Sequence, residues 1–425
     1  LNGEIKLLNS SLRKYGTNLE LYDFSVRSFT ENNESVINLR TDYVDADVRG
    51  NFNLAGLSSA INSALFRLLP SRYAMPVKKS EFVKERLILY VAFKNTDKLN
   101  NFFRTGIQLS EKSIFNGEIL SDSIVSMNWS AKKLQFRNNT FNDLRVEGNL
   151  LPSGLSVLLR SSSLNLLGQS DLKGFSADLE TKPDNFVFNL NWDNREAILN
   201  RGNFTARGSY VKNAAESSRP VLKIDIDSTG IDNRNNLWKI SHSTILLDSN
   251  VVNVNKLLIS NNERYYLIDG TLSENRDDSL RLEFKGIDIS PLNYLISGKN
   301  EPDQLDLGLK GELNGKVLLT DIYHNPMLES NLEIKGFSML ESDYGNLSLI
   351  STWNNESKVA DIRVGNNLNG KKMLEVDGHY DPDNKTIDLS VTTDKLPINA
   401  LNPSLNVFAS EIAGSATGRI RLYGG

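Results

Sequence analysis

The segment Ile387-Asp388-Leu389-Ser390-Val391 alternates apolar and polar side chains residue by residue. Successive side chains of a β-strand point to opposite faces, so this pattern predicts a strand with one apolar and one polar face. The alternation recurs in Leu305-Asp-Leu307-Gly-Leu309, Leu332-Glu-Ile334, Leu347-Ser-Leu349, Ile362-Arg-Val364 and Ile420-Arg-Leu422. Turn-forming clusters separate such runs at intervals of roughly 8–12 residues, which is typical of all-β chains. The sequence therefore predicts an all-β fold.

A second pattern interrupts the alternation three times. It reads Phe93-Lys-Asn-Thr-Asp97-Lys-Leu99-Asn100, Phe284-Lys-Gly-Ile-Asp288-Ile-Ser-Pro-Leu292-Asn293 and Val391-Thr-Thr-Asp394-Lys-Leu-Pro-Ile398-Asn399. After each copy the strands resume with a polar residue and a glycine, at Asn116-Gly117, Asn314-Gly315 and Thr417-Gly418. Stacked units of this kind bury their faces only against their neighbours, so the recurrence predicts an extended repeat architecture. We expect approximate units near residues 87–190, 191–283, 284–390 and 391–425, the last of them incomplete.

The chain has 425 residues, which is more than one compact core usually accommodates. No linker or low-complexity tract divides it, so we expect residues 1–425 to be one extended segment, cut from a longer protein. Composition alone favours ordinary β-sandwiches, whose inner faces the apolar stripes would form. The unbroken alternation favours instead one long, curved, antiparallel-type sheet around an apolar groove, with a few short helices. Both readings remain open at the level of sequence.

One convincing helix interrupts the strands at residues 54–69. Apolar residues recur there at a spacing of 3–4, namely Leu54, Leu57, Ile61, Ala64, Leu65 and Leu68, and Pro70 ends the helix. The segment carries one cation, Arg67, so it predicts a core-covering or end-capping helix more than a membrane-surface helix. Shorter helices are expected near residues 97–103, 291–296 and 397–401. No stretch reaches the roughly 18 apolar residues of a membrane span.

Signals for catalysis, metals and nucleic acids are weak. The chain has no cysteine, and its three histidines, His242, His324 and His379, are far apart in the sequence. The run Asp381-Pro-Asp383-Asn384 superficially resembles a calcium loop, but it lacks the central glycine and the closing glutamate, so it predicts a hairpin turn. A net charge of −4 argues against nucleic-acid binding. The sequence therefore predicts a protein that is not an enzyme, with no cofactor and no metal site.

Several segments resemble a known family. The run Thr41-Asp-Tyr-Val-Asp-Ala-Asp-Val-Arg-Gly-Asn-Phe52, followed by Leu54-Ala-Gly-Leu57 and a helix ending at Leu69-Pro70, resembles the middle of TamB-like translocation and assembly proteins of the Bacteroidota type. So do Leu309-Lys-Gly311-Glu-Leu-Asn-Gly315, Asn325-Pro326-Met-Leu328, Leu332-Glu-Ile334-Lys-Gly-Phe337 and Tyr344-Gly345-Asn-Leu347-Ser-Leu349. The resemblance spans most of residues 40–425 and rests on a diffuse pattern.

This resemblance implies an AsmA-like envelope protein of a Gram-negative bacterium. Such proteins cross the periplasm as a β-taco, a long sheet folded around an apolar groove, and an N-terminal helix, here outside the segment, anchors them to the inner membrane. The implied function is a conduit for phospholipid between the two membranes, with phospholipid acyl chains as partners. The implied alternative is a scaffold or chaperone that inserts outer-membrane proteins together with a TamA-like partner of the BamA family.

A third reading is a surface adhesin or glycan-binding β-repeat, which predicts aromatic side chains clustered on the outward faces. The four tryptophans, Trp129, Trp192, Trp238 and Trp353, are dispersed in the sequence, which disfavours it. For the conduit, the alternation places lipid-binding side chains on the inward face of the strands. The expected groove-lining residues are Leu305, Leu307, Leu309, Val317, Leu319, Leu332, Ile334, Leu347, Leu349, Ile362, Val364, Ile387, Leu389, Val391, Ile420 and Leu422.

Overall fold

The computed structural model describes residues 2–14, 16–51, 65–73, 86–94, 96–120, 124–151, 153–166, 170–212, 220–234, 236–293, 307–324, 326–340, 342–397 and 414–424. Within these ranges, 27 strands form one long antiparallel sheet, accompanied by two short helices. The predicted all-β fold, with its long antiparallel sheet and few helices, is confirmed. Contacts divide the chain into two compact units, Leu1–Leu237 and Trp238–Gly425, which are described separately.

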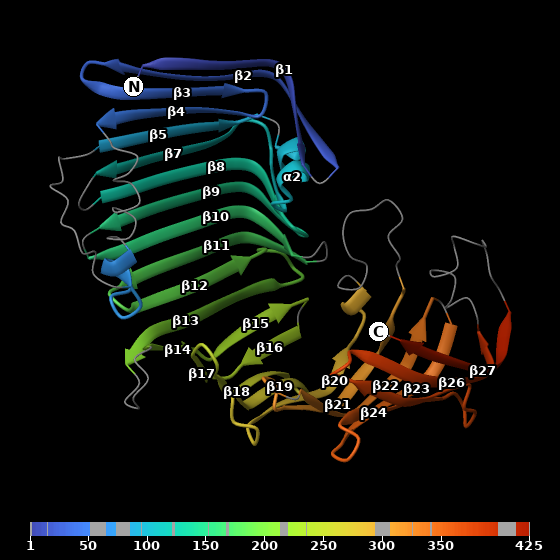
Figure 1. Ribbon diagram of the computed structural model, residues 1–425. Helices are drawn as coiled ribbons and strands as arrows, with labels where there is room; N and C mark the ends of the chain where they lie inside the picture. Colours follow the sequence, from blue (N-terminus) through green and yellow to red (C-terminus); the bar gives the residue numbers. More distant parts are fainter. Residues whose placement is uncertain are drawn as a thin grey trace. The chain divides into compact units, whose positions relative to one another are not determined.

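The first unit is a ladder of strands stacked side by side, blue to green in Figure 1. Its strands are β1 (Gly3–Lys14), β2 (Thr17–Glu31), β3 (Glu34–Thr41), β4 (Val44–Asn51), β5 (Arg86–Phe93), β6 (Ile107–Leu109), β7 (Ser113–Leu120), β8 (Ile124–Phe136), β9 (Asn139–Leu151), β10 (Gly154–Leu166), β11 (Ser170–Lys182), β12 (Asn185–Asp193), β13 (Asn200–Lys212), β14 (Pro220–Ile226) and β15 (Thr229–Asn233). Most strands pair with the next one in the chain. The exceptions are β5, which pairs with β7, β6, which pairs with β8, and β15, which pairs with β13.

The second unit continues as an antiparallel ladder from β18 to β27, in which each strand pairs with the next. Its strands are β17 (Ser243–Leu247), β18 (Val252–Asn261), β19 (Arg264–Leu272), β20 (Ser279–Asp288), β21 (Lys310–Thr320), β22 (Met327–Met339), β23 (Ser342–Asn354), β24 (Val359–Asn367), β25 (Leu374–Asp381), β26 (Thr386–Pro397) and β27 (Ser415–Gly424). The strand β16 (Asn236–Ile240) lies at the division between the units and pairs with β18.

The helix predictions have mixed outcomes. The helix α2 (Asp97–Phe103) lies where the sequence predicts it, and its buried Phe102 packs against Leu19, Leu21 and Tyr43. Of the expected helix at 54–69, residues 65–68 are helical and residues 54–64 lie outside the described residues. Of the helix expected at 291–296, residues 292 and 293 are helical, residue 291 is in a turn, and residues 294–296 lie outside the described residues. The prediction of a helix beginning at Pro397 is wrong at that residue, because Pro397 pairs with Ser415 as the last residue of β26.

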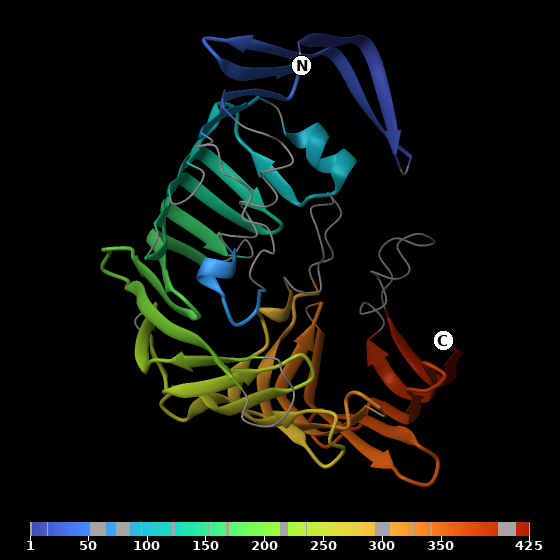
Figure 2. The ribbon, with the colours of Figure 1, turned by 60° about the vertical axis from the view of Figure 1, so that its left-hand side comes forward.

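The helical turn at residues 65–68 follows β4 in the chain but contacts the turn between β11 and β12 (Figure 2). Ser71 donates from its backbone N to Asp184 Oδ1 at 3.0 Å and from its Oγ to Asp184 Oδ2 at 2.8 Å. The Asp184 N–H in turn donates to the Leu68 carbonyl at 2.8 Å, which satisfies a carbonyl that the helix end leaves free. These three hydrogen bonds join parts of the chain that are 113 residues apart.

Several strands in the described part of the second unit carry a β-bulge, an extra residue that bends the strand, and four of these bulges share one arrangement. The pairing register shifts between Val254 and Leu257, between Phe284 and Ile287, between Ile334 and Phe337, and between Thr393 and Leu396. Each bulge contains a residue with positive φ, namely Lys256, Gly286, Gly336 and Lys395. Two of them, at Lys285-Gly286 and Asp394-Lys395, fall within the recurring interruption seen in the sequence. Two of the three copies of the sequence repeat therefore coincide with bulges.

A polar side chain on the next strand accepts the N–H of each positive-φ residue. Asp269 accepts Lys256 N at 3.1 Å, Asn314 accepts Gly286 N at 2.9 Å, Asn346 accepts Gly336 N at 3.2 Å, and Thr417 accepts Lys395 N at 2.9 Å. A bulge leaves one backbone N–H out of the ladder, so the side chain replaces the missing strand partner. This contact explains the polar residue before glycine at Asn314-Gly315 and Thr417-Gly418.

Replacing Asn314, whose side chain accepts the N–H of the bulge residue Gly286, tests whether such a contact stabilises the bulge. We expect Asn314→Ala to lower the free energy of unfolding by about 1–2 kcal/mol, because the Gly286 N–H loses its acceptor. The control is Asn331→Ala, since Asn331 is exposed on the same sheet and no acceptor or donor for its side chain occurs among the described residues. Urea unfolding followed by circular dichroism measures both. Equal losses in the two variants would contradict a specific role of Asn314.

Candidate functional site

Apolar side chains of the second unit meet in rows that cross its strands. Partners in an antiparallel pair point to the same face, so the register shows which residues share a face. One row runs Phe284, Gly315, Leu332, Leu349, Val364, Val376, Val391, Ile420. The next row runs Leu282, Val317, Ser330, Ser351, Ile362, Gly378, Leu389, Leu422. We call this surface of β20–β27 the second apolar face.

The register brings most of the predicted groove residues together on this face. Thirteen of the sixteen belong to it, namely Val317, Leu319, Leu332, Ile334, Leu347, Leu349, Ile362, Val364, Ile387, Leu389, Val391, Ile420 and Leu422. With strands about 4.8 Å apart, a row from β20 to β27 is on the order of 35 Å long.

The remaining three predicted residues do not join the rows. Leu305 lies outside the described residues. Leu307 and Leu309 precede β21 and are not in a strand, so the strand predicted there is wrong. Asn293 gives the reason, because its side chain accepts Leu309 N at 2.7 Å and donates to Leu309 O at 3.0 Å. Both backbone groups of Leu309 are thus withdrawn from any ladder, and its side chain is buried.

Large side chains of the second apolar face are half-buried, whereas those of a closed sandwich core would be fully buried. Leu332, Ile334, Leu349 and Val364 all have intermediate exposure. Toward the chain end the face opens further, and Ile420 is 60% exposed. The side chains therefore shield one another along the rows and still leave apolar surface accessible. Such a surface can take up a long, flexible, apolar ligand.

The first unit carries a corresponding apolar face that the sequence-based site list omits. Its central row runs Val26, Leu39, Ala46, Val91, Phe115, Trp129, Val146, Leu159, Ala177, Leu190, Phe204. We call this surface of β2–β13 the first apolar face. The signal was present in the sequence as alternation, for example in Leu87-Ile-Leu89-Tyr-Val91, but small residues such as Ala46 and Ala177 interrupt the rows and weaken it.

Glycines let aromatic rings lie flat on the first apolar face. A Cβ at Gly208 would approach Phe186 Cζ to 1.9 Å, and one at Gly202 would approach the Trp192 ring to 2.5 Å. Each glycine is the cross-strand partner of that aromatic residue. The rings therefore cover their glycine partners and keep apolar carbon continuous over positions that have no side chain.

All four tryptophans lie on the apolar faces. Trp129 and Trp192 are in rows of the first face, and Trp353 shares a strand face with Leu349. Trp238 stacks 5.9 Å from Tyr266, which itself meets Phe284 at 6.3 Å. Burial among these rings raises the pKa of the Tyr266 hydroxyl above its ordinary value. The aromatics thus contribute to apolar rows, and no tryptophan stands on the polar face, where a glycan platform would need it.

The opposite face of the strands is polar and laced with ion pairs between neighbouring strands. Arg86 pairs with Glu118 at 2.8 Å, and Arg421 pairs with Asp388 at 2.6 Å. The hydrogen bonds from Arg421 hold the pKa of Asp388 below its usual range. These side chains are exposed, so each pair adds little to stability. Their main effect is to keep this face in water and the apolar face away from it.

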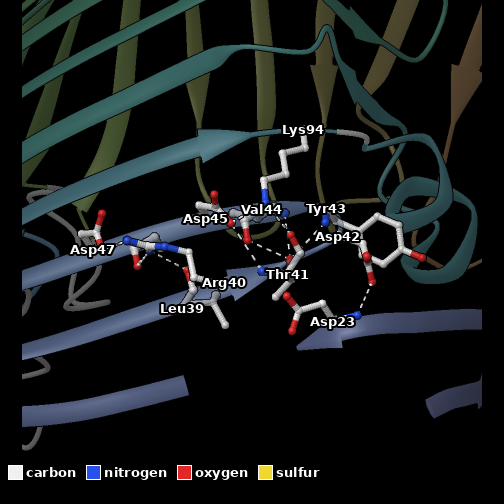
Figure 3. A network of polar contacts seen from close by, with 11 residues as sticks. Asp23, Leu39, Arg40, Thr41, Asp42, Tyr43, Val44, Asp45, Asp47 and Lys94 are labelled. Atoms are coloured by element: carbon white, nitrogen blue, oxygen red, sulfur yellow. Dashed lines mark hydrogen bonds and ion pairs between the residues drawn. The ribbon is translucent and has the colours of Figure 1, made fainter. Parts of the chain in front are cut away.

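The acidic run at residues 41–47 ties four strands together (Figure 3). Thr41 Oγ1 accepts Val44 N at 2.8 Å and closes the turn between β3 and β4. The Asp42 carboxylate accepts Asp23 N at 3.1 Å, which connects this turn to β2. From β5, Lys94 Nζ donates to the Thr41 carbonyl at 2.8 Å and pairs with Asp45 at 2.7 Å. The run that carries the family resemblance is therefore a structural hairpin.

No cluster of three or more histidine, aspartate or glutamate side chains suited to a metal ion occurs within the described residues. The run at 381–384 forms the turn between β25 and β26, and Asp381 Oδ1 accepts Asp383 N at 3.0 Å and Asn384 N at 3.1 Å. The Asn384 amide donates to Asp381 Oδ2 at 2.7 Å. The Asp381 carboxylate thus accepts hydrogen bonds from its own turn, which is typical of a hairpin, whereas in a calcium loop it would bind the ion.

Comparisons with known protein families, with curated proteins and with solved structures give no match to this chain. The described helices include none with the length and apolar character needed to cross a membrane. The two apolar faces are therefore the feature of the described structure that bears most directly on function.

The Asp381 turn gives a test by pH. Hydrogen bonds from Asn384, first from its side chain and then from its backbone, lower the pKa of Asp381. The turn is therefore stabilised above the ordinary aspartate pKa, and this contribution is lost as the pH falls through the lowered value. We expect Asn384→Ala to raise the Asp381 midpoint, measured by NMR of its side-chain carboxyl carbon. Asn262→Ala, in the turn between β18 and β19, is the control and should leave the midpoint unchanged, whereas equal midpoints in all three proteins would contradict the assignment.

Proposed function

We propose that this chain is a lipid-conducting segment whose two apolar faces hold the acyl chains of phospholipids. The observation that carries the proposal is the row structure of these faces. Half-buried apolar side chains follow one another from strand to strand without a charged residue in the central rows. Acyl chains need a continuous apolar track, and neighbouring positions along a track allow a chain to move without returning to water.

Exposed charge on the opposite face supports the same proposal. A lipid-carrying protein in an aqueous compartment must keep one surface wet, and the ion-paired face supplies it. A large apolar surface left empty would favour aggregation, so such a surface needs an occupant. Phospholipid matches it because its acyl chains can lie on the rows while its headgroup stays in water.

The resemblance to TamB-like proteins gives the proposal its cellular setting. In that setting the segment lies in the periplasm of a Gram-negative bacterium, anchored to the inner membrane through a helix outside it. An outer-membrane barrel of the TamA type would be its partner, and the apolar faces would form the groove of a β-taco. Photocrosslinking from the apolar rows distinguishes the two functions of the family, since lipid supports the conduit and a nascent barrel protein supports the scaffold.

Charges placed on the second apolar face test the conduit. We expect the double variant Ile334→Asp, Leu349→Asp to fold and to lose lipid binding and transfer at least tenfold, because an unpaired charge in an apolar track costs several kcal/mol. The two residues are close across β22 and β23, so both charges fall within one short stretch of the rows. Lipid transfer between vesicles, circular dichroism and protease resistance are measured together.

The matched control places the same charges on the other face of the sheet, on β23 and on β21, the other neighbour of β22. Leu318 and Ile350 are apolar residues of β21 and β23 that point to the polar face, where Leu318 pairs with Arg281 and Ile350 with Arg363. We expect Leu318→Asp, Ile350→Asp to retain lipid transfer. Unfolding of the Ile334, Leu349 variant would indicate a closed sandwich core, and full transfer by that variant would refute the proposed path.

A further inference from the structure

Three buried side-chain polar atoms have no hydrogen-bond partner within the described part of the chain, namely Trp129 Nε1, Ser330 Oγ and Tyr344 Oη. Trp129 lies in a row of the first apolar face and Ser330 in a row of the second, whereas Tyr344, near the start of β23, has no place in the rows. The indole N–H can only donate, and a hydroxyl closed off from water also needs an acceptor. Leaving such a donor unsatisfied is costly, so native structures rarely keep one without a reason.

Ser330 occupies a central place in its row. It lies between Val317 and Ser351 across the strands and is 6% exposed. The two serines differ in one respect, because Ser351 Oγ donates to the Leu328 carbonyl at 2.9 Å whereas Ser330 Oγ has no such partner within the described part of the chain. Ser351 Oγ thus has a partner inside the protein, whereas Ser330 Oγ is buried without a partner in the middle of an apolar row.

Trp129 shows the same combination in the first unit. Its ring lies between Phe115 and Val146 in the central row, and the ring is half-buried while the Nε1 atom itself is buried. A phenylalanine would fill most of this space without bringing a polar atom. Each unit therefore carries, in a row of its apolar face, one buried donor without a partner.

We infer that the ligand of these faces carries neutral hydrogen-bond acceptors within its hydrocarbon, as acyl carbonyl groups do, and that Trp129 Nε1 and Ser330 Oγ donate to them. A charged acceptor such as phosphate is disfavoured, because burying an unpaired charge in an apolar row costs far more than one hydrogen bond returns. An alkyl chain without a carbonyl would leave both donors unsatisfied. The inference rests on the proposed function and narrows its ligands to acyl lipids.

The experiment compares two phospholipids of equal chain length, one with ester-linked and one with ether-linked chains. The ether lacks the carbonyl but keeps the headgroup and the hydrocarbon. Competition against a fluorescent alkyl probe gives the Kd of each lipid for the whole chain. We expect the ester lipid to bind about 2- to 10-fold more tightly for each hydrogen bond formed.

Variants test whether the preference for the ester lipid comes from Trp129 Nε1 and Ser330 Oγ. Ser330→Ala together with Trp129→Phe should equalise the two lipids, while the matched pair Ser351→Ala and Trp353→Phe should keep the preference. NMR of the indole N–H groups gives a second measurement on the unaltered protein, in which the Trp129 proton should shift with the ester lipid and not with the ether lipid.

The outcomes separate this inference from the proposed function. Equal binding of ester and ether lipids by the unaltered protein overturns the inference and leaves the conduit intact, and so does a preference that survives in the Ser330, Trp129 variant. Failure of both lipids to bind overturns the conduit itself. If the double variant does not fold, the inference is tested by two measurements on the unaltered protein, namely the Kd values of the two lipids and the shift of the Trp129 indole proton.

Discussion

The antiparallel pairing register is the constraint on which the rest of this structure depends. Side chains alternate between faces with a period of two, so a slip of one residue in any strand would move its apolar residues to the polar face. Tight turns fix the register at many hairpins. Asn32 and Asn33, for example, both adopt positive φ between β2 and β3, as a two-residue turn compatible with strand twist requires.

The bulges preserve the apolar faces where the strands bend. A bulge places two residues of one strand opposite one of its partner, as with Lys285 and Gly286 opposite Asn314, between the pairs Phe284–Gly315 and Ile287–Leu313. Residues three apart then point to the same face, so the apolar rows continue through the bend. The Asn314 side chain stabilises this arrangement because it accepts the Gly286 N–H, which has no partner in the ladder. The bulge therefore both bends the strand and keeps the apolar face continuous.

Sequence alternation was sufficient to predict the fold class and the face of thirteen proposed lining residues, because a period of two depends only on local backbone geometry. It could not predict which strands meet, so the rows and the first apolar face became visible only from the register. Alternation also gave a wrong prediction where a side chain binds the backbone groups that a strand would need for pairing. Leu307-Gly-Leu309 has the pattern of a strand, but Asn293 binds both backbone groups of Leu309. The polar residue before glycine was visible in the sequence as part of a repeat. Its contact with the bulge could not be predicted, because the two residues lie on different strands and are far apart in the sequence.

A sheet with one apolar face is normally covered by a second layer of helices or strands, since otherwise its apolar surface stays in contact with water. The described residues of the second unit leave this face half-buried. In the proposed function, acyl chains take the place of the second layer. Ligand that binds only the folded state stabilises it in proportion to the logarithm of ligand concentration over Kd, so lipid occupancy and fold stability become linked. The backbone ladder and the ion-paired face do not depend on that layer. In the proposed conduit, the lipid track is therefore emptied and refilled while the sheet that forms it persists.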